Sequence, residues 1–334
     1  MTDSGADDRI ANSVLETIGS PLVSLSETGP VEVAGKLEGR NPSGSAKIRP
    51  AVAMLRAAEE DGRLAPGGRV VEASSGNTGI GLALACAVLD YELTVVMPAA
   101  RSPERRALMA AYGATVETVD GEMAAARERA DEIAAGDAVR LEQFADAANP
   151  RAHYEWTARE LLAATGDRRI DALVVAVGTG GTISGVGRRL RERWPDVAIV
   201  AVEPAGNAVL SGGPPGDGGF QGMGPGFVAE NVDLALIDRI ETVAIGPAEA
   251  ECRRLARKEG ILVGQSSGAA SLAAKRVARD LAEQLAGENH PPDQRDEPAR
   301  DERPADPGSK LVVTVFPDDG ERYLSAGTFE DEPD

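Results

Sequence analysis

The stretch RVVEASSGNTGIGLALACAVLD, residues 69–90, sets the fold class of this chain. Its first five residues, 69–73, predict a buried strand, and residues 78–90 predict a helix. A Ser/Gly-rich turn lies between the two segments. A strand that ends in such a turn and leads into a helix is the repeating unit of parallel α/β proteins.

The same alternation continues along the chain. Further strands are predicted over 93–98, 115–119, 171–177, 197–204, 260–264 and 310–316, and helices over 102–113, 123–135, 183–193, 252–260 and 268–286. Strands that alternate with crossover helices indicate parallel sheets flanked by helices, so we expect an α/β protein.

Length and charge restrict the class of protein further. With 334 residues and 42% hydrophobic content, the chain is long enough for two modest domains around a real core. A net charge of −19 argues against nucleic acid or an anionic membrane as partner. The acidic N-terminus is no signal peptide, and no apolar run reaches membrane-spanning length. We expect a soluble, cytoplasmic protein.

Several residue types are scarce. Only five of the 35 basic residues are lysines, and this excess of arginine and carboxylates suggests a halophilic chain adapted to concentrated salt. Cys86 and Cys252 form no CxxC motif and predict apolar packing, without a disulfide or zinc site. The two histidines are His153 and His290, which excludes Ser-His-Asp chemistry and His-ligated metal sites.

Residues 287–309 interrupt the α/β pattern. They hold seven acids and five prolines and almost no apolar side chains. Such a segment cannot offset its ordering entropy by burial, so it predicts an exposed, mobile insertion. A partner-binding loop is the alternative.

Two strand–turn–helix loops have the composition of anion sites. Residues 70–81 offer Ser and Thr hydroxyls and helix N–H groups, at a scale that suits a carboxylate, although an ordinary βα turn remains open. Residues 176–187 contain GTGGT at a helix start, which suits a terminal phosphate. A dinucleotide fingerprint fails there because Ile183 occupies the third glycine position, and no P-loop motif is present. Segments 260–270 and 317–324 alone predict a capped helix start and a loop.

Lys47, in NPSGSAKIRP (41–50), lies at the start of a predicted helix. Burial and the positive end of the helix dipole both lower a lysine pKa, which favours the neutral amine that attacks an aldehyde. Ser45 is predicted to cap this helix, with Pro50 in its first turn. A Schiff-base lysine, a phosphate site and a carboxylate site together describe pyridoxal phosphate holding an amino acid. The alternative is a solvated surface lysine.

The chain resembles the cysteine synthase (O-acetylserine sulfhydrylase) family of fold type II, tryptophan synthase β-like pyridoxal-phosphate enzymes. The resemblance runs from 18–25 to 320–325 and is broken only by the acidic insertion. It is carried by LEGRNPSGSAK, SGNTGI, SPERR, QF, NPRAHY, VGTGGT, GVGR, VAVEP, AVLSGG, FQGMGPGFV, GILVGQSSGAA and DDGERYLS.

The resemblance implies a homodimer of two-domain chains. One α/β domain comprises 41–150, with a mobile subdomain at about 90–135 that closes over substrate. The other comprises 1–40 plus 151–330. Lys47 is implied to hold the cofactor and to act as base on the substrate Cα, Asn77 to bind the cofactor 3′ oxygen, and Ser266 its ring nitrogen. The remaining implied residues are Gly178, Thr179, Gly180, Gly181 and Thr182 for the phosphate, and Ser74, Ser75, Gly76, Thr78, Gln143 and Gly222 for the substrate.

The implied reaction replaces the acetate of O-acetyl-L-serine with sulfide and gives L-cysteine. A hydroxyl at Ser266 makes the ring a weaker electron sink than a carboxylate would, which favours loss of a β leaving group. Cystathionine β-synthase-like, O-phosphoserine-using, dehydratase and non-catalytic relatives are the alternatives. A serine acetyltransferase is a candidate partner.

Three positions need comment against this family. Ile48 replaces the usual aspartate, which removes any ion pair of that aspartate. Gln221 stands where some O-phosphoserine-using relatives have arginine, which favours acetate as the leaving group. His153 is predicted to be structural.

Overall fold

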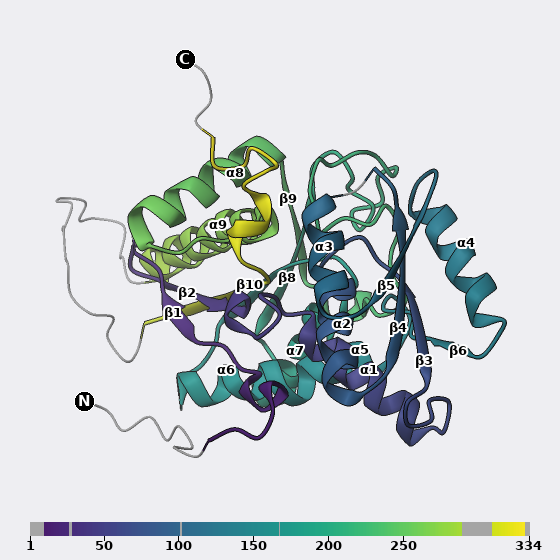
Figure 1. Cartoon of the computed structure of the whole chain (residues 1–334). Coiled ribbons are helices and arrows are strands. Elements are labelled where there is room, and N and C mark those ends of the chain that lie inside the picture. The colour runs from purple at the N-terminus through teal and green to yellow at the C-terminus, as the bar shows by residue number, and fades with distance from the viewer. Residues whose placement is uncertain (1–9, 27–28, 101, 167, 289–308, 331–334) are drawn as a thin grey trace.

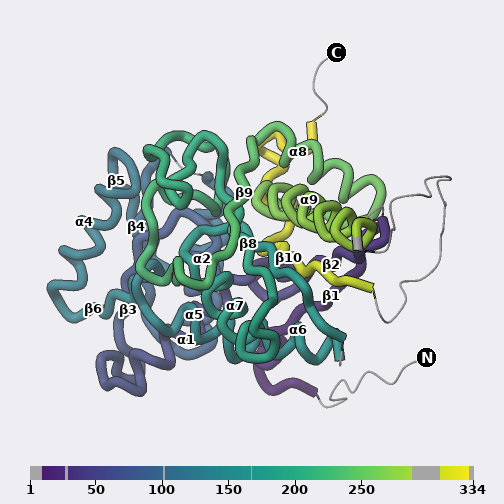
Figure 2. The backbone as a smooth tube through the Cα atoms, turned by 180° about the vertical axis from the view of Figure 1, so that it is seen from behind, coloured from purple at the N-terminus to yellow at the C-terminus, as the bar shows by residue number. Residues whose placement is uncertain are grey.

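The chain folds around two sheets, each flanked by helices (Figure 1). The computed structural model describes residues 10–26, 29–100, 102–166, 168–288 and 309–330. The two sheets lie side by side in both views, with the chain crossing between them (Figure 2). The expected α/β class is confirmed.

The four-stranded sheet has the order β5-β4-β3-β6, and all its strands are parallel. Its strands are β3 (Arg69–Ala73), β4 (Glu92–Pro98), β5 (Thr115–Val119) and β6 (Ala138–Arg140). Helices α1 (Ile48–Glu60), α2 (Asn77–Leu89) and α3 (Pro103–Ala111) share one core with this sheet, and α4 (Met123–Ala134) packs on the other face.

The six-stranded sheet has the order β1-β2-β10-β7-β8-β9, in which only β1 runs antiparallel to its neighbour. Its strands are β1 (Leu22–Ser24), β2 (Glu32–Leu37), β7 (Ala172–Ala176), β8 (Ala198–Pro204), β9 (Arg239–Val243) and β10 (Leu311–Phe316). Helices α8 (Ile245–Arg254) and α9 (Gln265–Glu288) cover one face, and α6 (Ala158–Thr165) and α7 (Gly181–Arg193) cover the other (Figure 1).

Short helical segments complete the fold. Helix α5 (Ala148–Ala152) continues into the π-helix η3 (His153–Thr157) and then α6, and α8 continues into the π-helix η5 (Leu255–Glu259). The 3-10 helices are η1 (Val14–Thr17), η2 (Glu38–Arg40), η4 (Leu234–Leu236) and η6 (Gly320–Tyr323).

Most predicted strands are confirmed to within one residue, but the strand expected over 260–264 is wrong. Gly260 ends the preceding π-helix in the left-handed conformation, and the segment then makes only one isolated bridge, from Val263 to Asp319. Ile261 and Val263 are buried under the 318–320 turn, whereas Leu262 between them is exposed, so the hydrophobicity of this run reflects core packing of two side chains outside a sheet.

Two predictions about organisation are not decided by the fold. The domain boundaries, and closure of residues 90–135, stay predictions.

Residues 289–308 of the acidic insertion lie outside the described residues. Within the described ranges, no helix is long and apolar enough to cross a membrane, and no cluster of metal-binding side chains occurs.

Candidate active site

The candidate site lies where the carboxyl ends of the two parallel sheets come together, which is where ligands bind in open α/β sheets. Hydrogen bonds join side chains from the two sheets at this point. Lys47 Nζ donates to Thr179 Oγ1 at 3.1 Å, and Asn77 Nδ2 donates to Asp318 Oδ2 at 2.6 Å. These pairs are 132 and 241 residues apart in sequence.

Lys47 occupies the N-cap position of α1. Ser45 therefore lies two residues before the cap, and the prediction that Ser45 itself caps the helix is wrong. Its hydroxyl instead accepts the Lys47 backbone N–H at 3.3 Å and shapes the approach to the helix. Burial lowers the pKa of Lys47 to about 8, although the Asp318 carboxylate opposes this shift. The amine is thus a usable nucleophile and base near neutral pH.

The glycine loop between β7 and α7 is too tightly packed for side chains. A Cβ on Gly178 would lie 2.7 Å from the Gly222 carbonyl oxygen, and one on Gly181 would lie 1.9 Å from Asn149 Oδ1. Gly180 adopts a positive φ of 85° at the N-cap of α7. The bare backbone N–H groups of this helix start, with the hydroxyls of Thr179 and Thr182, form a site suited to a phosphate. The residues present therefore fit pyridoxal phosphate.

The loop after β3 and the segment after β6 form a second polar site. Ser74 Oγ accepts the Gly79 N–H at 3.0 Å, which fixes the first turn of α2. Thr78 Oγ1 donates to Gln143 Oε1 at 2.5 Å. Ser75 and Gly76 lie in the same loop, whereas Gly222 enters from the segment after β8, against Gly178. Thr78 and Gln143 are thus brought together as a carboxylate site requires.

Asn77 and Ser266 lie on the first turns of α2 and α9. Ser266 is buried, and Asn77 is held on both sides, by Asp318 and by an Arg322 guanidinium that donates to its Oδ1. Asp318 in turn accepts the Tyr323 hydroxyl at 2.7 Å. Sequence reasoning gave Asp318 no role, although DDGERYLS was the motif that pointed to it.

Arg105 is a second contact that sequence reasoning missed. Its guanidinium, on α3, donates to Gln221 Oε1 at 2.7 Å and lies 5.8 Å from the centre of the Tyr323 ring. SPERR belonged to the resemblance, but only the fold shows that its first arginine reaches Gln221, in the segment between β8 and β9. This contact ties α3 to the segment that carries Gly222.

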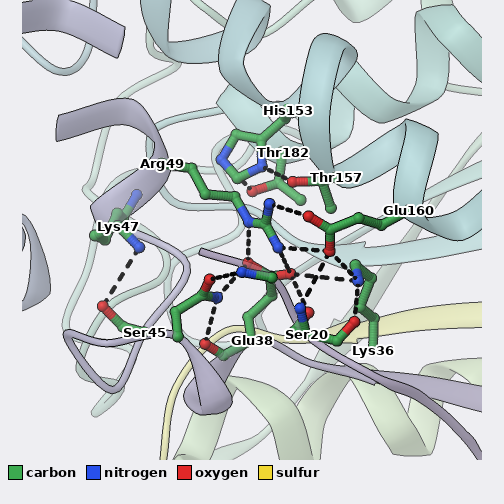
Figure 3. Close-up of polar contacts among 12 residues, drawn as sticks. Ser20, Lys36, Glu38, Ser45, Lys47, Arg49, His153, Thr157, Glu160 and Thr182 are labelled. Carbon is green, nitrogen blue, oxygen red and sulfur yellow. Dashed lines mark hydrogen bonds and ion pairs between the residues drawn. The ribbon is translucent and has the colours of Figure 1, made fainter. Parts of the chain in front are cut away.

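A buried ionic network lies behind Lys47 (Figure 3). Arg49 donates to both Glu38 oxygens at 2.6 and 2.9 Å and to both Glu160 oxygens at 2.6 and 2.8 Å. Lys36 adds a bond to Glu160 at 2.7 Å. Ile48, where the resemblance leads us to expect aspartate, is buried in the apolar core beside α2. Arg49 is therefore neutralised from other elements, without a carboxylate at position 48.

A lysine amine between a phosphate site and a carboxylate site is the arrangement that pyridoxal-phosphate enzymes need. Residues 15–289 match the family described as "Pyridoxal-phosphate dependent enzyme", so the chain belongs to this family and pyridoxal phosphate is its cofactor. Within the family, the chain is 41% identical over 313 residues to a cysteine synthase of Staphylococcus aureus, covering 92% of this chain and 93% of the relative.

Solved structures agree with this placement. O-acetylserine sulfhydrylase isoform 3 from Entamoeba histolytica superposes with a TM-score of 0.87 at 35% identity, covering 100% of this chain and 96% of the other. The O-acetylserine-dependent cystathionine beta-synthase from Helicobacter pylori gives 0.82 at 31% identity, covering 96% and 99%. The expectations of a fold type II architecture and of a pyridoxal-phosphate-dependent β-replacing enzyme are confirmed.

Proposed function

We propose that this protein is a cysteine synthase that converts O-acetyl-L-serine and sulfide to L-cysteine and acetate. The sulfur of sulfide bonds to the substrate Cβ, the bond from Cβ to the acetate oxygen breaks, and the proton taken from Cα is returned there. Bound pyridoxal phosphate supplies the electron sink that makes the Cα proton removable. The observation that carries the proposal is the Lys47 amine, 3.1 Å from Thr179 and lowered in pKa to about 8.

The chain's own groups divide the remaining work. Lys47 takes and returns the Cα proton, which an amine with a pKa of about 8 can do near neutral pH. Ser74, Ser75, Gly76, Thr78, Gln143 and Gly222 are proposed to bind the substrate. In this set, the Thr78 hydroxyl is committed to Gln143 Oε1, which leaves the Gln143 amide hydrogens to donate to a carboxylate. Asn77 and Ser266 are proposed to orient the cofactor ring, and the 178–182 loop to hold its phosphate.

The proposal extends to assembly and location. We propose a cytoplasmic homodimer, with a serine acetyltransferase as candidate partner. We propose an open groove of about 880 Å³ as part of the dimer surface; apolar side chains such as Leu15, Ile18 and Trp156 line it together with charged ones such as Arg56 and Glu155. Sedimentation of the purified protein tests this, and a monomer at micromolar concentration would reject it.

Product analysis tests the reaction itself. The holoenzyme is incubated with O-acetyl-L-serine and sulfide, and we expect L-cysteine and acetate in equal amounts. Lys47→Ala should abolish turnover, since no other amine reaches Thr179 among the described residues. L-serine, O-phospho-L-serine and homocysteine replace donor or acceptor in parallel reactions. Release of a keto acid and ammonia without sulfide would reject β-replacement in favour of a dehydratase.

A further inference from the structure

One face of the α5–η3 helix lies directly behind the glycine loop. Asn149 and His153 are four residues apart, so their side chains lie on the same helix face. Helix α7 approaches this face closely: a Cβ on Gly185 would lie only 2.1 Å from the Pro150 carbonyl oxygen. The close approach of Gly181 to Asn149 has the same origin. Glycines on α7 thus allow a polar helix face to reach the loop.

Asn149 fixes the hydroxyl of Thr179. Its Nδ2 donates to the Gln143 carbonyl oxygen at 2.7 Å and to Thr179 Oγ1 at 3.0 Å. The reverse amide orientation would set Oδ1 against that carbonyl oxygen. Thr179 Oγ1 also accepts from Lys47 Nζ at 3.1 Å. A hydroxyl oxygen has two acceptor sites, so in the cofactor-free protein the Thr179 hydrogen is directed away from both donors; Asn149 is the donor that stays when Lys47 binds the cofactor.

His153 stands in the same relation to Thr182 (Figure 3). Its Nε2 lies 3.2 Å from Thr182 Oγ1, and its Nδ1 lies 2.9 Å from Thr157 Oγ1. Burial, with the charges of Arg49 and Lys47, lowers the pKa of His153 well below its usual value, against the opposing Glu160 carboxylate. A neutral imidazole has one donor and one acceptor. We assign the tautomer in which Nδ1 accepts from the Thr157 hydroxyl and the hydrogen on Nε2 is donated to Thr182 Oγ1.

We propose that Asn149 and His153 are positioning residues that orient the Thr179 and Thr182 hydroxyls, so that both donate to the phosphate group of the cofactor. Each hydroxyl oxygen receives a hydrogen bond from behind, and its own hydrogen is left for the anion. This deepens the proposed function and rests on the same cofactor site. It also explains why an apparently structural histidine is buried beside the phosphate loop.

Asn149 also contacts the carboxylate site, because the backbone carbonyl to which it donates belongs to Gln143. A change at Asn149 therefore affects both sites. Asn231 Nδ2 donates to the same carbonyl oxygen at 3.0 Å, and among the described residues its side chain makes no hydrogen bond to Thr179 or Thr182. Asn231→Leu is therefore the matched control: it removes a bond to Gln143 and leaves Thr179 and Thr182 untouched.

The test compares two ligands that differ only in the phosphate. Cofactor-free protein is titrated with pyridoxal phosphate and, separately, with pyridoxal, and binding is followed by protein fluorescence and visible absorption. The readout is the ratio of the two dissociation constants. Asn149→Leu and His153→Leu should each reduce the preference for the phosphorylated ligand by about tenfold, the scale of one hydrogen bond to a charged group. His153→Gln keeps an amide donor and should restore most of it, and Asn231→Leu should leave the ratio unchanged.

An unchanged ratio in both leucine variants would overturn the proposal. This includes the case in which affinity for both ligands falls equally, because such a loss indicates general damage and no phosphate-directed effect. Should Asn149→Leu fail to fold by circular dichroism, the His153→Leu and His153→Gln pair carries the same test. Neither O-acetylserine nor sulfide enters the assay, so failure of the proposed reaction and failure of this assignment are separate outcomes.

Discussion

Arg49→Met should strongly destabilise the protein, because it removes the centre of a buried ionic network. Arg49 and Glu38 are both fully buried, and the guanidinium makes four contacts of 2.6–2.9 Å to Glu38 and Glu160. Methionine preserves most of the apolar volume but supplies no charge. Lys36, at 3.8 Å from Glu38, then faces two carboxylates alone.

The expected magnitude follows from the burial of Glu38. Burial by itself would raise the pKa of Glu38, yet Arg49 and Lys36 hold it below its usual value, so the carboxylate is charged in the fold. Removing one partner of such a buried pair costs about 3–5 kcal/mol. Protein stabilities are about 5–15 kcal/mol, so this is a large share of the total.

Equilibrium urea unfolding followed by circular dichroism measures this change as a lower midpoint at similar slope. Arg129→Met is the matched control, because Arg129 makes comparable contacts to Glu117 and Glu132 on the surface. Exposed pairs contribute about 0–1 kcal/mol, so the control should unfold nearly like the parent. Equal losses in the two variants, or a loss below about 1 kcal/mol for Arg49→Met, would refute the reasoning.

Three further predictions concern the cofactor site and the surface. Gly181→Ala places a Cβ 1.9 Å from Asn149 Oδ1, so we expect a folded protein whose affinity for pyridoxal phosphate falls at least tenfold by absorption titration; unchanged affinity would show that the loop yields easily. The rate at which cofactor-free protein combines with pyridoxal phosphate should rise with pH and level off above about 8, the pKa of the Lys47 amine, and a rate that climbs through pH 10 would contradict that value. The melting temperature should rise in molar KCl, because screening relieves repulsion within a net charge of −19, and a flat or falling value would end the halophilic interpretation.

Most of the strands that were predicted are buried on both faces, although β5 (Thr115–Val119), at the edge of its sheet, has no buried residue. β7 (Ala172–Ala176) is an unbroken apolar run between two helical layers, and β10 (Leu311–Phe316) is interrupted only by Thr314; such runs are visible in sequence. β2 (Glu32–Leu37) was not predicted, because Gly35 and Lys36 interrupt its apolar pattern. In the fold Lys36 is buried and forms an ion pair with Glu160. β6 is only three residues long. Tertiary partners, rather than local pattern, make these segments strands.

Some features of the candidate site could be predicted from the sequence, and others are seen only in the fold. The Lys47 helix start and the glycine loop carry local signals, because turns and helix termini require particular residues. The contacts of Asn149 to Thr179, and of Arg105 to Gln221, join residues 30 and 116 positions apart. These side chains come into contact only when the chain has folded and the two sheets lie side by side. Local patterns therefore predicted two of the loops that form the candidate site, the Lys47 helix start and the glycine loop, but could not predict what holds those loops.

The most direct test of the central claim is to locate the lysine that holds the cofactor. The holoenzyme is reduced with borohydride, digested, and analysed by mass spectrometry for a lysine that carries the pyridoxyl phosphate group. The chain has only five lysines, so the assignment is unambiguous. We predict the added mass on the peptide that contains Lys47 and on no other. The group on Lys36, Lys258, Lys275 or Lys310, or on no lysine, would contradict the account.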